Sequence, residues 1–232
     1  FKLGVTDYLL KSELEERDLI NVLNDIMMAD DALMQEKANR ENTVKQFVWG
    51  NVFQNSDYGK INIKKNASVG ICVAQIINYD DIMQQEWNGD KESLQYGTHN
   101  VISEIMFEHN ECEFFFDAYD RIFFVISGDR TEAQSTAEKI AARVKDILKN
   151  IFEYEVKFGY VGVTSDRKTL KEYVTLANKT AKYCFCTGKW MNIYAENQNK
   201  MQFVDCITKY NMFGDLLDSI GMQELVKFDD SI

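Results

Sequence analysis

The sequence predicts an α+β fold in which helices pack on an antiparallel β-sheet, preceded by a long N-terminal helix. Apolar runs rich in aromatic and β-branched residues recur through residues 67–195, as expected of buried strands. Between these runs, apolar residues follow helical spacing. The resulting order, β-α-β-β-α-β and then α-β, contains the split βαβ arrangement of a ferredoxin-like sheet with helices on one face.

Residues 12–66 predict a helical linker before the first strong strand. The run SELE at residues 12–15 has the S-x-x-E spacing of a capping box and predicts a helix start. The apolar stripe that follows lapses across residues 35–42 and otherwise consists of Leu19, Leu23, Ile26, Leu33, Val44, Phe47 and Val48. Two interpretations remain open: a parallel coiled-coil dimer, and a helix that packs on its own domain.

The first half of the sheet is predicted from three successive segments. Residues 69–79 form a continuous apolar run (VGICVAQIINY) and predict a strand. Residues 92–109 contain a helical pattern. Residues 112–127 predict a hairpin, because two apolar arms rich in Phe and β-branched residues flank a short polar turn.

The second half repeats this alternation. Residues 131–151 give the clearest amphipathic helix, with alanine and aliphatic side chains on one face. A strand at 155–163, a helix at 170–187 and a short strand at 191–195 follow. Gly188 is placed just after the helix, where a left-handed residue commonly ends it. Residues 196–232 predict one or two further helices.

Composition limits the classes of function. The net charge of −11 disfavours direct binding to the DNA backbone. No apolar run approaches the roughly 20 residues that cross a bilayer, so we predict a cytoplasmic protein without membrane contact. The five cysteines predict reduced, buried thiols. Cys184 and Cys186 have only His99 and His109 as histidine partners, which disfavours zinc; we expect no metal and no cofactor.

The closing helix and strand carry a family resemblance. The run ANKTAKYC at residues 177–184, followed by Gly188 and Lys189, resembles the A-D-x-A-L-Y-x-A-K-x-x-G-[RK] signature that closes GGDEF domains. Gly162 stands at the glycine of their S-I-G-V-A strand. The resemblance covers residues 67–195, implies a nucleotidyl-cyclase-like fold, and places the GGDEF hairpin at Ala118, Tyr119, Asp120, Arg121 and Ile122.

The same resemblance implies that cyclase chemistry is lost. A cyclase needs carboxylates that hold two divalent ions against a triphosphate. Gln75 stands in place of the first-strand aspartate and is a poor Mg²⁺ ligand. Ala118 and Tyr119 replace the hairpin glycines, and Arg121 replaces the glutamate that follows Asp120. We therefore expect no catalytic residues, and we expect Tyr119 to fill space that the substrate would need.

Three further positions depart from the family pattern. Phe185 stands where the family has a phosphate-binding lysine, and His109 and Cys112 stand at the product-binding R-x-x-D site. The resemblance therefore implies no inhibition by a cyclic dinucleotide through that site.

Four polar residues near the expected cleft remain to be interpreted. Asp80 and Asp81 are interpreted as acids of a strand-to-helix turn. Asp120 and Arg121 are expected to pair locally or cap the hairpin turn. Arg121 and Lys189 are the candidate phosphate contacts.

The N-terminus carries a second resemblance. The run GVTDYLLK at residues 4–11 resembles the G-A-x-D-Y-L-L-K-P end of a response-regulator receiver domain, with Lys11 at the lysine that contacts the phosphorylated aspartate. Ser12 stands where proline is usual. A receiver end (1–11), a helical linker (12–66), a GGDEF-like domain (67–195) and a helical segment (196–232) resemble the order in YesN-type response regulators, which carry an AraC-type DNA-binding domain. We expect this chain to be part of a longer protein.

Three functions follow as hypotheses. The first is a non-catalytic regulatory and dimerization module of a response regulator. It would form a homodimer, and it would meet a sensor histidine kinase and DNA through parts outside this chain. The second is a receptor for a nucleotide or other small molecule in the former cyclase cleft. The third is a diguanylate cyclase-like enzyme of unusual type.

Overall fold

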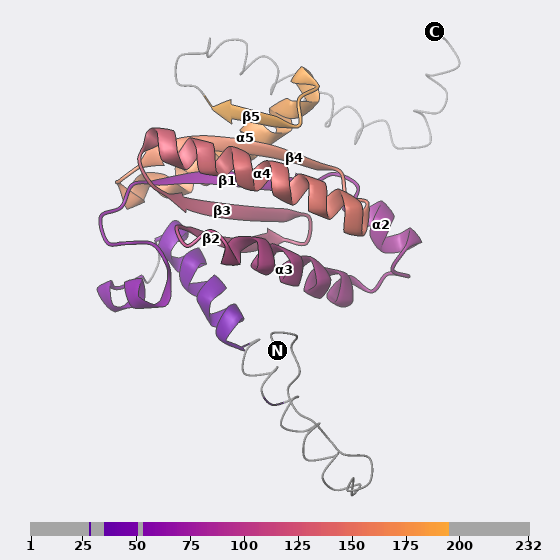
Figure 1. The fold of residues 1–232 in the computed structure, drawn as a ribbon, viewed down its shortest axis with the longest axis horizontal. Coiled ribbons are helices and arrows are strands. Elements are labelled where there is room, and N and C mark those ends of the chain that lie inside the picture. Colours follow the sequence, from indigo (N-terminus) through magenta and orange to yellow (C-terminus); the bar gives the residue numbers. More distant parts are fainter. Residues whose placement is uncertain (1–27, 29–34, 51–52, 195–232) are drawn as a thin grey trace, which may run out of the picture.

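The computed structural model describes residues 28, 35–50 and 53–194 (Figure 1). Lys11, the predicted capping box and the helical segment expected over residues 196–232 lie outside the described residues. Within them, residues 35–49 form a helix, which confirms that part of the long helix.

A five-stranded sheet forms the centre of the domain, in the order β2-β3-β1-β4-β5. The pairs β2–β3, β3–β1 and β1–β4 are antiparallel, and β5 runs parallel to β4. This order is the split βαβ sheet with one added edge strand, so the predicted α+β class is confirmed. The strands are β1 (Val69–Ile76), β2 (Cys112–Ala118), β3 (Arg121–Ser127), β4 (Val156–Thr164) and β5 (Met191–Tyr194).

The three helices predicted between the strands begin and end close to their expected bounds, and the structure adds one short α-helix and two 3-10 helices. The 3-10 helices are η1 (Asn55–Lys60) and η2 (Arg167–Thr169). The α-helices that follow the helix of residues 35–49 are α2 (Tyr79–Gln85), α3 (Lys91–Phe107), α4 (Arg130–Phe152) and α5 (Leu170–Thr187). The Asp129 side chain accepts hydrogen bonds from two backbone N–H groups at the start of α4, as an N-cap does. Gly188 has φ 68° at the end of α5, which confirms its predicted role.

Helices cover both faces of the sheet. Alternate strand residues face opposite sides, so Ile76 and Phe158 join a core beneath α3 and α4. Ile71 belongs instead to a second core beneath α5 and the helix of residues 35–49. The split βαβ pattern predicted helices on one face, and it did not predict the cover on the other. A sheet buried on both faces explains why β1 is apolar almost throughout.

The helix of residues 35–49 packs on its own domain. Val44, Phe47 and Val48 are 0–2% exposed and join the second core. These three side chains are therefore unavailable to a coiled-coil partner, and the described part of the helix follows the second of the two interpretations.

Segment ends differ from prediction mainly after β1. The strand was expected to run to residue 79, but it ends at Ile76, and Tyr79 begins α2. Asp80 and Asp81 lie in the first turn of α2, where carboxylates are favoured by the helix dipole. This placement agrees with their interpretation as acids of a turn that leads into a helix.

The β4–α5 contact depends on a glycine. A Cβ atom on Gly159 would lie 2.2 Å from the Ala177 carbonyl oxygen and 2.4 Å from the Ala181 nitrogen. Since neither backbone atom can move without displacing α5, only glycine permits this close approach.

Arg167 of η2 contacts the segment that precedes the sheet, around Phe47 and Phe53. Its guanidinium carbon lies 4.5 Å from the ring centre of Phe53 and 5.1 Å from that of Phe47. Both distances are those of a cation–π contact. The C-terminal end of the helix of residues 35–49 is thereby held against the loop that precedes α5.

Candidate functional site

The predicted hairpin lies at one end of the sheet. Strands β2 and β3 pair in register until a bulge between Phe116 and Ala118, and Ala118 then faces Arg121. Arg121 also faces Gln75 of β1. The structure therefore brings together the first-strand and hairpin positions that the resemblance to a cyclase singled out. Ile122, the last hairpin residue, is fully buried in the core.

Gln75 and Asp120 are joined by a hydrogen bond. The Gln75 side-chain nitrogen donates to Asp120 Oδ2 at 2.5 Å, and the Asp120 carbonyl accepts from the Ile76 N–H at 2.8 Å. The Asp120 carboxylate is thus engaged by an amide from the position at which the resemblance to a cyclase expects a carboxylate. The position carries one negative charge with an internal donor.

Arg121 pairs with a different acid from the one expected. Its Nη1 lies 3.4 Å from Asp117 Oδ2, whereas Asp120 accepts from Gln75. The expected local pair between Asp120 and Arg121 is therefore replaced by two separate pairs. The bulge explains this exchange, because it sets Asp117 outside the regular β2–β3 pairing.

Tyr119 occupies the hairpin tip and stacks on a buried tyrosine. Its ring lies 6.1 Å from that of Tyr79, with an interplanar angle of 24°, and the Lys91 ammonium lies 5.8 Å from its centre. Burial raises the pKa of Tyr79 to about 12, so this phenol stays neutral. The aromatic pair fills the tip with side chains where a cyclase has glycines.

Lys189 and Arg121 do not lie close together in the structure. Arg121 begins β3 and Lys189 lies just before β5, and strands β1 and β4 lie between β3 and β5. Three strand spacings correspond to about 14 Å. A closer cation was missed in the sequence: Lys157 of β4 faces Gln75 directly. Its only sequence signal was its place at the start of a strand whose register could not be known.

The structure also places the remaining predicted positions. Cys112 is buried, and its N–H donates to the His109 carbonyl at 3.1 Å, so these two residues form the turn before β2. Phe185 is 46% exposed on α5. Among residues 35–50 and 53–194, no three His, Cys, Asp or Glu side chains gather as a metal-ligand set.

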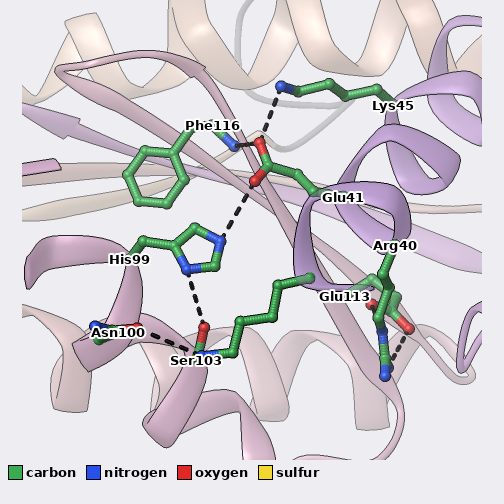
Figure 2. Close-up of polar contacts among 9 residues, drawn as sticks. Arg40, Glu41, Lys45, His99, Asn100, Ser103, Glu113 and Phe116 are labelled. Atoms are coloured by element: carbon green, nitrogen blue, oxygen red, sulfur yellow. Dashed lines mark hydrogen bonds and ion pairs between the residues drawn. The ribbon is translucent and has the colours of Figure 1, made fainter. Parts of the chain in front are cut away.

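A second polar cluster lies where the helix of residues 35–49 meets α3 and β2 (Figure 2). Glu41 is its centre: one carboxylate oxygen accepts from the Phe116 N–H at 3.0 Å and lies 2.9 Å from Lys45 Nζ. The other oxygen lies 3.4 Å from His99 Nε2. Burial raises the pKa of Glu41, but the bonds from His99, Lys45 and the Phe116 N–H outweigh it and lower the pKa overall.

Glu113 extends this cluster along β2. Its side chain is 4% exposed, and it accepts two hydrogen bonds from Arg40, at 2.7 and 3.0 Å. The Asn62 N–H donates to the same carboxylate at 2.5 Å. A buried carboxylate with three donors is fully compensated. A cavity of about 310 Å³ lies beside these pairs, between the helix of residues 35–49, α3 and β2.

One indirect sign of the second cluster is present in the sequence. Arg40 and Glu41 fall within residues 35–42, where the apolar stripe of the N-terminal helix lapses. Their partners in α3 and β2 lie more than 50 residues away, so the sequence alone did not identify them.

Comparisons with known proteins give a consistent set of structural neighbours. No family model matches the sequence, and no curated protein matches it. A GGDEF domain from Pseudomonas aeruginosa is similar at 12% identity and a TM-score of 0.46, over 61% of this chain and 92% of that one. An EAL/GGDEF domain protein from M. capsulatus is similar at 13% identity and a TM-score of 0.48, over 57% and 88%.

A third neighbour is the GGDEF domain of DgcB from Caulobacter crescentus, solved with c-di-GMP. It is similar at 10% identity and a TM-score of 0.41, over 55% of this chain and 78% of that one. Because all three scores are below 0.5, the α+β class rests on the strand order and helix packing of this chain. Of the described helices, none combines the length and apolar character required to span a membrane.

Proposed function

We propose that this chain is a non-catalytic regulatory module with a degenerate GGDEF-like domain. The observation that carries the proposal is the hydrogen bond between Gln75 and Asp120. A nucleotidyl transfer through two metal ions needs a cluster of carboxylates at this place. Here Gln75 supplies an amide, and Asp120 is left as one acid with an internal partner.

The neighbouring charges support the same proposal. Arg121 and Lys157 face Gln75 from the two flanking strands, so cations stand on both sides of the position where a metal would bind. A divalent cation would be repelled by them at close range. The stacked pair of Tyr79 and Tyr119 occupies the tip itself.

An assay of nucleotide turnover tests this proposal. The protein is incubated with GTP or ATP and Mg²⁺ or Mn²⁺, and products are separated by chromatography. The expected result is no metal-dependent product. Turnover that depends on metal and disappears in Asp120→Ala would overturn the proposal and favour the enzyme hypothesis. Asp146→Ala, which removes an acid of α4 from the surface, is the matched control.

The wider role that we propose is the central module of a response regulator, which links a phosphorylation input to a DNA-binding output. Its support is the resemblance of residues 4–11, with Lys11, to the end of a receiver domain. The decisive experiment is to sequence the flanking coding region. A receiver with a phosphoacceptor aspartate upstream and paired helix-turn-helix motifs downstream would support this role, and their absence would reject it.

A second candidate function is a receptor for a phosphate-bearing ligand. It is favoured by Arg121, whose Nε is buried without a hydrogen-bond partner, and by Lys157 in the same cross-strand row. A thermal-shift titration with GTP, GDP and cyclic dinucleotides tests it. A rise in Tm that is lost in Arg121→Ala is expected of a receptor, and no rise at millimolar ligand argues against one.

A further inference from the structure

Strand β2 is an edge strand of the sheet. Edge strands present unpaired N–H and C=O groups that can pair with a strand of another chain. On β2, the outward N–H of Phe116 donates to the Glu41 carboxylate at 3.0 Å. The N–H of Cys112 donates to the His109 carbonyl at 3.1 Å. The edge is therefore closed by a side chain at one end and by a turn at the other.

The side chain that closes the edge belongs to a helix with two unlike halves. Residues 44–48 are held by apolar packing, because Val44, Phe47 and Val48 are 0–2% exposed; this part is named the anchor. Residues 35–43, named the latch, contact β2 and α3 through polar groups (Figure 2). Arg40 pairs with Glu113, and Glu41 pairs with His99 and Phe116.

The polar contacts of the latch are partly exposed, whereas the apolar contacts of the anchor are dry. The side chain of Arg40 is 44% exposed, and those of Glu41 and His99 are 16% and 20% exposed. Ion pairs that water can reach are weakened by salt, whereas apolar side chains resist exposure. A displacement of the N-terminal helix would therefore detach the latch before the anchor.

Detachment would change β2 in two ways. The Phe116 N–H would lose its acceptor, and buried Glu113 would lose Arg40. A capped edge is a device that keeps an edge strand from pairing, and here the cap depends on the latch, whereas the charge of Glu113 belongs to β2 and stays. What remains is a strand with three consecutive phenylalanines, Phe114–Phe116, a composition that favours pairing.

We propose that the latch is a releasable cover, and that its release lets β2 pair with β2 of a second copy of this chain. The inference rests on the proposed regulatory role and adds the mechanism by which a moving N-terminal helix controls self-association. A second copy is the favoured partner because it offers the same edge, and two identical edges related by a two-fold axis form a closed dimer.

The test uses the full chain and the double variant Arg40→Ala/Glu41→Ala. The matched control is Glu108→Ala/Arg143→Ala, which removes an exposed ion pair between α3 and α4. Hydrogen exchange of the amides of β2 is measured in dilute solution, and the molar mass is measured by sedimentation equilibrium over a wide concentration range. Neither measurement involves nucleotide, so the outcome is independent of the turnover assay.

In dilute solution the Phe116 amide of the latch variant is expected to exchange roughly tenfold faster or more. At high concentration its mass should approach twice that of the parent, and the β2 amides should become protected again. The control should match the parent in both measurements.

Unchanged exchange would overturn the proposal, because the latch would then not cover the edge. Faster exchange with the parental mass at every concentration would overturn it too, because an open edge would then not pair. If circular dichroism shows that the double variant is unfolded, the single variant Glu41→Ala, which keeps Arg40 and Glu113 paired, replaces it. The same two measurements on Glu41→Ala then support or overturn the proposal.

Discussion

The amide of Gln75 donates a hydrogen bond of 2.5 Å to the carboxylate of Asp120. Gln75 lies on β1, and Asp120 lies in the turn between β2 and β3, the hairpin that the resemblance to a cyclase singled out. Because the acceptor is a half-buried carboxylate, this bond contributes to stability on the scale of a hydrogen bond to a charged group.

Gln75→Ala removes the side-chain amide that donates a hydrogen bond to the Asp120 carboxylate. We expect the free energy of unfolding to fall by about 1.5 kcal/mol, the scale of a hydrogen bond to a charged group. Urea unfolding at neutral pH measures it. Gln134→Ala, on the exposed face of α4, is the control and should change stability by less than about 0.5 kcal/mol. Equal losses in both variants would contradict the assigned bond.

Gly159→Ala tests the close contact between β4 and α5. A Cβ atom there would meet backbone atoms of Ala177 and Ala181 at 2.2 and 2.4 Å, so α5 must shift outward. We expect a loss of about 3 kcal/mol, at the upper end for overpacking, in denaturant unfolding. Gly162→Ala is on the same strand with nothing within 4 Å and should be nearly neutral. A nearly neutral Gly159→Ala would show that α5 lies farther from the sheet.

Arg40→Ala tests the buried carboxylate of Glu113. Removing the guanidinium leaves a carboxylate that is 4% exposed with only the Asn62 N–H as donor. The free energy of unfolding should fall by about 3 kcal/mol, because an uncompensated buried charge is costly. Arg40→Ala/Glu113→Gln should recover part of this loss, since the amide carries no charge. A double variant that is less stable than Arg40→Ala would contradict this account.

The lowered pKa of Glu41 predicts a loss of stability in acid. Burial opposes this lowering, while His99, Lys45 and the Phe116 N–H cause it. A carboxyl whose pKa is lower in the folded than in the unfolded state stabilises the protein above its unfolded pKa, about 4.3. This contribution is lost as the pH falls through the folded pKa.

Glu41→Gln removes this titration, so its deficit in stability relative to the parent should be constant above about pH 5 and should shrink below about pH 4. Urea unfolding from pH 3 to 7 measures the difference. Glu155→Gln, at an exposed residue before β4, is the control. A deficit that stays constant down to pH 3 would contradict the lowered pKa.

The order of the strands and helices in residues 67–194 followed from the sequence, because apolar periodicity and turn residues are local signals. Gly188 is one example: its position after an amphipathic helix indicated the left-handed end that the structure contains. The short helix α2 was missed because the apolar run of β1 continues to Tyr79, the residue at which α2 begins.

The sites were harder to predict, because they depend on residues that are distant in sequence. The row formed by Arg121, Gln75 and Lys157 exists only once the strand register is known. The pairing of Arg40 with Glu113 spans 73 residues, and no local pattern marks it. The lapse of the apolar stripe at residues 35–42 indicated where the N-terminal helix changes character, but not what it contacts.

The contacts of the helix of residues 35–49 also constrain the order in which the chain can assemble during synthesis. Glu41 meets a residue 75 positions later, and the Phe47 carbonyl accepts from Arg167, 120 positions later. At about 5–20 residues per second, a ribosome needs roughly 6–24 s to make 120 residues. Until strands β1 to β3 have been made, the apolar side chains of this helix have no sheet to cover, and the contact with Arg167 forms later still. Nascent chains therefore pass through a period in which contact with a chaperone or a neighbouring chain competes with their own fold.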